Sequence, residues 1–212
     1  MSYIAYALLF VVVQFVSNRI FTYRGIPRRD LIRRVTIYMP LLAPILWKGI
    51  PPLAWFVTPL AYVLAIGASL LGLAIQIRNI MPFFDRAVAL LLRPMPKSDM
   101  LWAEYSVIGS AVLEEVFYRF GVPKSDTLIG LVLSAGLFSI PHAINRQTRK
   151  SMTWKSYVTL GVLGGSWFAT TTISHSLLPA ILGHLVYNSP KSISLAWRYR
   201  VRKSSEIQNA SV

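Results

Sequence analysis

The sequence predicts an all-α protein: a polytopic transmembrane helix bundle of about seven spans, with a polar site inside the bundle. Hydrophobic residues make up 54% of the chain and charged residues 14%, whereas a soluble domain carries about 25% charge. Apolar runs recur along the whole chain, and the basic residues cluster between them. The net charge of +14 is therefore assigned to loops at a membrane surface, and nucleic acid is excluded as a partner because no basic stripe lies on a soluble face. The chain has no cysteine, which excludes disulfides and thiolate metal sites.

The first half of the chain is predicted to form three spans. Tyr3–Val16 is an apolar run with no charge before it, unlike a cleaved signal peptide, so we interpret it as a first span with its N-terminus outside. Val35–Trp47 is a short second span, interrupted by Pro40 and Pro44, which leaves a re-entrant loop as an alternative. Leu53–Ile77 is the longest clean span.

The second half is predicted to form four more spans after a segment, Pro82–Leu92, that could lie in the interface as an amphipathic helix. We divide the chain into N-terminal transmembrane helices (1–100), a core with intramembrane polar residues (101–197) and a basic disordered tail (198–212). The four spans are Leu101–Phe120, Thr127–Ile144, Tyr157–Ile173 and Ser176–Trp197.

The distribution of basic residues predicts an orientation. With the N-terminus outside, the basic segments after spans one, three, five and seven fall on one side of the membrane and hold about nineteen of the 22 Lys and Arg residues. Lys48, Arg119 and Lys124 are the remainder. The positive-inside rule therefore predicts an integral, multi-pass membrane protein whose basic loops and C-terminus are cytoplasmic.

The fourth predicted span carries charge where charge is costly. Glu114, Glu115 and Arg119 lie in a run that is otherwise apolar from Leu101 to Val122. Insertion scales assign roughly 2.5–3.5 kcal/mol to an Asp, Lys or Arg at the centre of a membrane helix, so such groups need partners. Glu115 and Arg119, four residues apart, can pair along one helix face, whereas Glu114 points about 100° away.

Two histidines and an amide lie inside other apolar runs. His142 is in the fifth span, and His184 and Asn188 share one face of the seventh. Each has a purely structural interpretation as an interhelical hydrogen bonder, and Glu115–Arg119 could be a structural ion pair. Together they are what water activation needs, because a carboxylate can take the proton of a water and imidazole or amide groups can orient that water or stabilise an oxyanion. Alternatively, Glu114, His142 and His184 could ligate a divalent metal such as zinc and leave a position open for water.

The spacing also predicts a geometric difficulty. If the chain turns near Pro123, Glu114 lies about nine residues before the turn and His142 about nineteen after it. At ~1.5 Å per residue their depths differ by roughly 15 Å, so straight antiparallel helices would keep them apart. Either the turn dips into the bilayer, or Pro141 and helix tilt adjust the depth.

The order Glu-Glu-x-x-x-Arg, Phe-x-x-x-His, His-x-x-x-Asn on successive membrane helices resembles the CPBP intramembrane proteases. That family includes the type II CAAX prenyl endopeptidases and the bacteriocin-processing or self-immunity (ABI) proteins. The resemblance covers roughly 101–189. It implies that Glu114 activates water with the aid of His142, that His184 and Asn188 hold the water or the oxyanion, and that Glu115 and Arg119 shape the site. The motif residues are Glu114, Glu115, Arg119, Phe138, His142, His184 and Asn188.

The chain departs from the family pattern at two positions close to these motifs. The glycine that usually follows the arginine is displaced by Phe120, and Gly121 comes one step later. Pro141 precedes His142 directly and is expected to loosen or kink that helix. Neither departure removes a catalytic side chain, so we expect an active enzyme.

Three functions remain open from the sequence. The first is a metallo- or glutamate-type intramembrane endopeptidase whose partners are the lipid bilayer and a membrane-anchored protein or peptide substrate, prenylated CAAX proteins included. The second is a non-catalytic immunity or scaffold protein of the same fold. The third is a proton- or cation-coupled carrier, which the lack of pseudo-symmetric halves disfavours.

Overall fold

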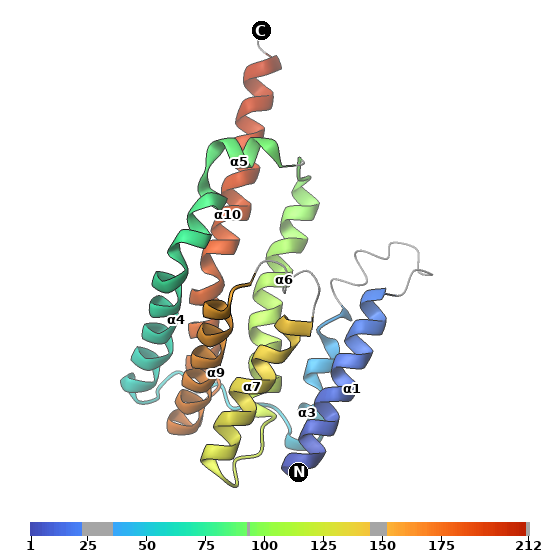
Figure 1. The fold of residues 1–212 in the computed structure, drawn as a ribbon, viewed down its shortest axis with the longest axis vertical. Helices are drawn as coiled ribbons and strands as arrows, with labels where there is room; N and C mark the ends of the chain where they lie inside the picture. The colour runs from blue at the N-terminus through green and yellow to red at the C-terminus, as the bar shows by residue number, and fades with distance from the viewer. Residues whose placement is uncertain (23–35, 93, 145–151, 211–212) are drawn as a thin grey trace.

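The computed structural model describes residues 1–22, 36–92, 94–144 and 152–210, and within these ranges it consists of helices and the turns between them. The long helices run up or down along one long axis (Figure 1). The predicted all-α bundle is thus confirmed. The upward helices are α1 (Tyr3–Thr22), α4 (Pro59–Ile80), α7 (Thr127–Ile144) and α10 (Leu178–Ala210), and the downward ones are α6 (Lys97–Glu115) and α9 (Trp154–Ser174).

Three of the described helices are long and apolar enough to cross a membrane by length and composition: Tyr3–Ile20, Pro59–Phe84 and Thr127–Ile144. Helices α6, α9 and α10 correspond to the other predicted long spans, but they carry more polar and charged residues. Large apolar side chains point outward from the apolar helices, as Leu8, Val63 and Leu128 do with more than 60% of their surface exposed. A bilayer would cover such surfaces.

The predicted second span, Val35–Trp47, is wrong as a continuous helix. The described part forms a 3-10 turn, η1 (Met39–Leu42), and one short helix, α3 (Ile45–Lys48). Pro40 and Pro44 are the physical reason, because each lacks a backbone N–H and its ring clashes with a preceding turn of helix. The basic segments at 23–35 and 145–151 lie outside the described residues, so the orientation of the basic loops stays a prediction.

Helix α4 begins six residues later than predicted, with Pro59 in its first turn, where the missing N–H costs nothing. The segment predicted as one interfacial helix over Pro82–Leu92 divides into η2 (Met81–Phe84) and α5 (Arg86–Leu91). Asp85 separates the two, and its carboxylate accepts from the backbone N–H groups of Ala87 and Val88 as an N-cap.

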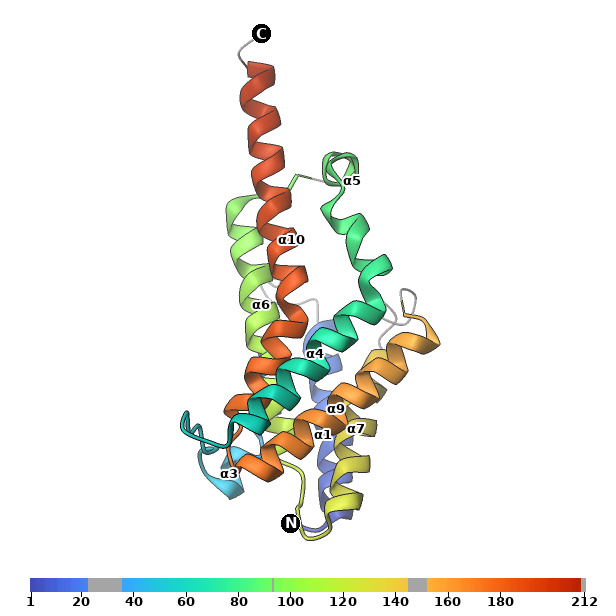
Figure 2. The ribbon, with the colours of Figure 1, turned by 90° about the vertical axis from the view of Figure 1, so that its left-hand side faces the viewer.

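The prediction of a disordered tail is wrong for residues 198–210, which continue α10 as helix beyond the ends of its neighbours (Figure 2). The tail gains partners that hydropathy could not reveal. Arg202 donates to the carbonyls of Leu90 and Leu92, and the rings of Trp197 and Phe84 lie 6.2 Å apart. These contacts tie the basic end of α10 to α5 and η2.

Small residues set the close packing of α4 against α10. The Ser69 hydroxyl is hydrogen bonded to the carbonyls of Ala65 (2.8 Å) and Gly183 (2.7 Å). A Cβ built at Gly183 would lie 2.7 Å from Trp167 Nε1 and 2.8 Å from the Ala65 carbonyl oxygen. Only a residue without a side chain allows this approach, as in other membrane helix pairs.

Gly183→Ala is therefore expected to destabilise the protein by about 1–3 kcal/mol, because the new methyl group meets backbone that cannot move cheaply. Gly67→Ala, on α4, is the matched control. A Cβ there meets nothing within 4 Å, so the alanine should stabilise the helix by about 0.5–1 kcal/mol. Unfolding of both variants in detergent measures the difference, and equal stability would contradict the packing argument.

Candidate active site

The acid pair stands where α6 changes its winding. The helix is regular to Glu115 and then continues as one π-helical turn, η3 (Val116–Phe120), closed by the bond from Gly121 N–H to the Val116 carbonyl at 2.9 Å. A π turn accommodates one extra residue and often occurs at functional sites. The extra residue of the π turn explains why Phe120 follows Arg119 and the family's glycine comes one position later. Position 121 requires glycine because a Cβ there would lie 2.4 Å from the Phe117 carbonyl oxygen.

Glu115 and Arg119 form the ion pair expected from their four-residue spacing. Glu115 Oε2 lies 3.0 Å from Arg119 Nε, and both side chains are fully buried. Arg119 Nη1 donates to Ser134 Oγ on α7 at 2.8 Å, and the guanidinium carbon lies 4.7 Å from the ring centroid of Phe138. The arginine thus ties α6 and η3 to α7 while neutralising the buried carboxylate.

His184, on α10, lies between the two carboxylates. Its Nδ1 is 2.8 Å from Glu115 Oε1, and its Nε2 is 3.9 Å from Glu114 Oε2. The imidazole is 5% exposed, Glu115 is fully buried and Glu114 is 18% exposed. The two acids therefore differ in partners and exposure. Glu115 is held by His184 and Arg119, and Glu114 is partly exposed to solvent.

The contact with Glu115 places a proton on Nδ1 of His184. A carboxylate that pairs with Arg119 accepts hydrogen bonds, so His184 Nδ1 donates the bond to Glu115. In a neutral ring the lone pair is then on Nε2, on the side of Glu114. A carboxylate behind an imidazole commonly sets the tautomer and ring orientation in this way.

Two aromatic rings hold the His184 imidazole in place. Trp167 on α9 stacks against it, with centroids 4.6 Å apart and planes 20° apart, and Phe138 on α7 packs edge-on at 5.7 Å. Trp167 Nε1 in turn donates to Ser69 Oγ at 3.3 Å. Sequence reasoning missed Trp167 and Ser134 as site residues. Ser134 was detectable because it lies one turn before Phe138 on the same face, whereas nothing in the pattern of α9 singles out Trp167.

His142 lies near the end of α7, where it contacts Phe138 one turn earlier. Its Nδ1 is 3.0 Å from the Phe138 carbonyl oxygen, and its ring packs edge-on against the Phe138 ring at 5.5 Å. The same phenyl ring thus contacts both histidines. Pro141 does not end the helix, which continues to Ile144. Phe138, one turn closer to the start of α7, is the motif residue that packs against His184, in keeping with the depth difference that the spacing predicts for His142.

Asn188 lies one helical turn after His184, as its spacing requires. Its amide nitrogen donates to the Val107 carbonyl on α6 in a long bond of 3.4 Å. Val107 is seven residues, or two turns, before Glu114. The amide therefore occupies the α6–α10 interface immediately beyond the Glu114–His184 pair.

The predicted metal ligands do not form a metal cluster. No group of three or more His, Cys, Asp or Glu side chains is arranged to hold a metal ion anywhere in the described ranges. Glu114, His142 and His184 are therefore not brought together as three ligands. The donor set in this arrangement does not fit zinc, which takes three or four ligands at about 2.0–2.3 Å.

The comparison with protein families places this site in a matched segment. Residues 96–190 match the family described as type II CAAX prenyl endopeptidase Rce1-like. No curated protein and no solved structure matches the chain. The matched segment begins at the start of α6 and ends two residues after Asn188, so it contains all three motifs. The apolar helices and this match indicate an integral membrane protein and a protease. The resemblance read from the motifs is thereby confirmed: the core of the chain, from α6 to the middle of α10, matches the Rce1-like family model.

Proposed function

We propose that this protein is an intramembrane endopeptidase in which Glu114 and His184 activate a water molecule for attack on a peptide bond. The observation that carries the proposal is the placement of His184: Glu115 fixes its Nδ1 at 2.8 Å, and its Nε2 faces Glu114 at 3.9 Å. Of the two acids, Glu114 is partly accessible and Glu115 is buried, so we assign proton transfer to Glu114.

The space between Glu114 and His184 suits one water. Their facing atoms, 3.9 Å apart, are too far for a direct hydrogen bond, yet one water oxygen can lie about 2.8 Å from both. An ionised Glu114 and the Nε2 lone pair are both acceptors, so they take the two hydrogens of that water. A lone pair of its oxygen is then left to point at a substrate carbonyl, which is the orientation that attack requires.

In the proposed reaction, Glu114 takes one proton as the water oxygen bonds to the carbonyl carbon. The tetrahedral oxyanion is stabilised by hydrogen-bond donors, for which Asn188 is proposed because its bond to Val107 is long and easily exchanged. The protonated Glu114 then gives its proton to the leaving amine as the C–N bond breaks. His142, which packs against Phe138, is proposed to assist Glu114 in activating the water. Glu115 with Arg119 is proposed to hold His184 in its tautomer.

The proposed substrate is a membrane-anchored protein or peptide, with prenylated CAAX-type proteins as the class that the family match favours. A lipid anchor would hold such a chain beside the helices and raise its local concentration. Cleavage of matched prenylated and unprenylated peptides by the reconstituted protein tests this class. Equal rates for both would overturn the prenyl requirement but not the peptidase proposal.

His184→Gln is expected to lower the cleavage rate by about 10²–10⁴-fold. The glutamine amide can still donate to Glu115, but it has no ring nitrogen lone pair to direct at the water. The assay uses purified protein in vesicles, with the unfolding midpoint as the check that the variant is folded. A folded His184→Gln protein with wild-type activity would remove His184 from the mechanism, and a wild-type protein that cleaves no membrane-anchored substrate would favour the non-catalytic immunity or scaffold alternative.

A further inference from the structure

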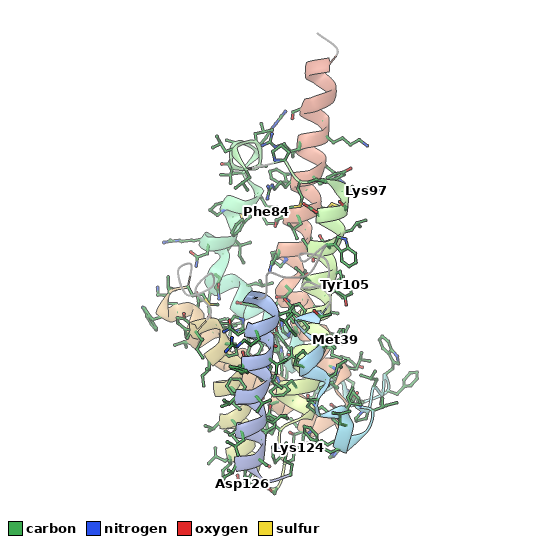
Figure 3. All side chains as sticks on the ribbon, turned by 90° about the vertical axis from the view of Figure 1, so that its right-hand side faces the viewer. Met39, Phe84, Lys97, Tyr105, Lys124 and Asp126 are labelled. Atoms are coloured by element: carbon green, nitrogen blue, oxygen red, sulfur yellow. The ribbon has the colours of Figure 1, made fainter. Side chains whose placement is uncertain are left out.

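A second polar feature lies outside the proposed catalytic site, in a cavity of about 290 Å³ at the end of the bundle where α7 and α10 begin. Its volume is near the lower end of the range for small-molecule sites, roughly 300–1,000 Å³. Figure 3 shows Lys124 at this end, beside Asp126 and opposite Lys97 and Phe84. The cavity is lined by Lys48, Pro52, Phe120, Lys124, Thr171, His175 and Leu177.

The cavity is cationic and has no acidic lining residue among those the structure describes. The Lys48 ammonium donates to the carbonyls of Phe120 (2.7 Å) and Val122 (3.0 Å), which leaves its third N–H for a ligand. Burial, and next the charge of Lys124, lower the pKa of Lys48 to about 8, and burial lowers the pKa of Lys124. Two ammonium groups that share a cavity without an acidic lining residue in the described ranges make a favourable place for an anion.

The walls of the cavity are fixed by hydrogen bonds between segments far apart in sequence. The turn between α9 and α10 contains His175 in the left-handed conformation, with φ of 52°. Directly after it, Leu177 N–H donates to the Pro52 carbonyl at 2.9 Å and Ser176 Oγ to the Ala54 carbonyl at 3.0 Å. The cavity is thus built by three tied segments rather than by isolated surface lysines.

An exposed apolar surface lies beside the cavity on the same segments. Leu46, Ile50, Trp55 and Phe56 precede or follow the lining residues Lys48 and Pro52 in sequence, and each is more than 60% exposed. Exposed aromatic and aliphatic side chains next to lysines are typical of the membrane interface, where acyl chains meet polar head groups. This surface favours a lipid over a small soluble anion as the source of the ligand.

The distribution of basic residues in the sequence also supports an anion site at this cavity. Of the three basic residues that the predicted topology leaves off the basic side, Arg119 is buried in the ion pair with Glu115. The other two, Lys48 and Lys124, both line this cavity. A face that is otherwise poor in Lys and Arg thus places its two lysines at one site.

We propose that this cavity binds a phosphate group, supplied by the head group of an anionic phospholipid, through Lys48, Lys124 and His175. Basic pockets between membrane helices commonly bind lipid head groups in this way. The acyl chains would lie on the exposed apolar side chains of residues 46–56. The site is separate from Glu114 and His184 and does not depend on the proposed peptidase activity.

The test is lipid binding by the full chain in nanodiscs or detergent, measured as lipid retained in native mass spectrometry and as a shift of the unfolding midpoint. Phosphatidylglycerol, phosphatidylcholine and inorganic phosphate are the three probes. Lys124→Gln is the main variant because Lys124 as a whole residue is exposed, although its ammonium lies 5.9 Å from the centroid of the Phe168 ring. Lys155→Gln, an exposed lysine outside the cavity, is the control, and Lys48→Arg is a second cavity variant that keeps the charge.

Wild type and Lys155→Gln are expected to prefer phosphatidylglycerol over phosphatidylcholine, and Lys124→Gln to weaken that binding roughly fivefold. Lys48→Arg should retain the preference if it folds. An equal loss in Lys124→Gln and Lys155→Gln would mean general surface attraction and would overturn the site. An effect of inorganic phosphate as large as that of phosphatidylglycerol would overturn the lipid as the source. No response to either anion would overturn the proposal.

Discussion

Replacing Glu114 with glutamine is expected to lower the rate of peptide cleavage by about 10²–10⁴-fold while the protein stays folded. The amide has the shape of the carboxylate but cannot take a proton from water. Glu114 is 18% exposed and His184 Nε2 lies 3.9 Å from its carboxylate, so little folding energy depends on its charge. Because the loss concerns the chemical step, it should appear in kcat rather than in KM.

The matched control is Glu104→Gln, which makes the same change ten residues earlier on the same helix. It should cleave at the wild-type rate, because position 104 lies almost three turns from the Glu114–His184 pair. Both variants are compared with the wild type in vesicles on one substrate. Full activity in Glu114→Gln would leave the water-activation mechanism without its base.

The second large effect is expected on stability. Arg119→Met should destabilise the protein by about 3–5 kcal/mol, because it leaves the Glu115 carboxylate buried without its cation. Methionine can fill much of the space beside Phe138 and Trp167, so the loss reports mainly the charge. Chemical unfolding in detergent measures it. Arg200→Met, an exposed arginine on α10, is the control and should change stability by less than about 0.5 kcal/mol.

The double variant Glu115→Gln with Arg119→Met separates charge from packing. Removing both charges should restore part of the stability that the single change loses, since no uncompensated ion remains buried. If the effects of the two substitutions simply add, the pair is not coupled and the ion-pair interpretation fails.

The spacing of residues predicted several contacts correctly because they are local to one helix. Four residues separate Glu115 from Arg119, and the structure pairs them. Thr127–Ile144 was predicted with the bounds that α7 has, because an apolar run between a turn and a basic segment leaves little choice. One failure also has a local reason, because Pro40 and Pro44 break the predicted second span. The other does not: the helical tail has contacts with α5, more than 100 residues away in sequence, that only folding supplies.

The different contacts of Glu114 and Glu115 could not be predicted in the same way. The sequence places Glu114 and Glu115 about 100° apart on a helix, but it does not say which of them meets His184. That depends on how α10 rotates and how deep it lies against α6. The structure brings Glu115 to Nδ1 and Glu114 to the side of Nε2, and it adds Trp167, from a helix that carries no motif.

The sequence by itself determined that this is a helical membrane protein and which polar side chains its bundle must contain, since hydropathy and helical period are properties of a single segment. Only the tertiary structure decided the π turn after Glu115, the ring of Phe138 between the two histidines and the gathering of Lys48 with Lys124. Those features arise where several helices meet, and the depth and rotation of one helix against another are fixed by packing across the whole bundle.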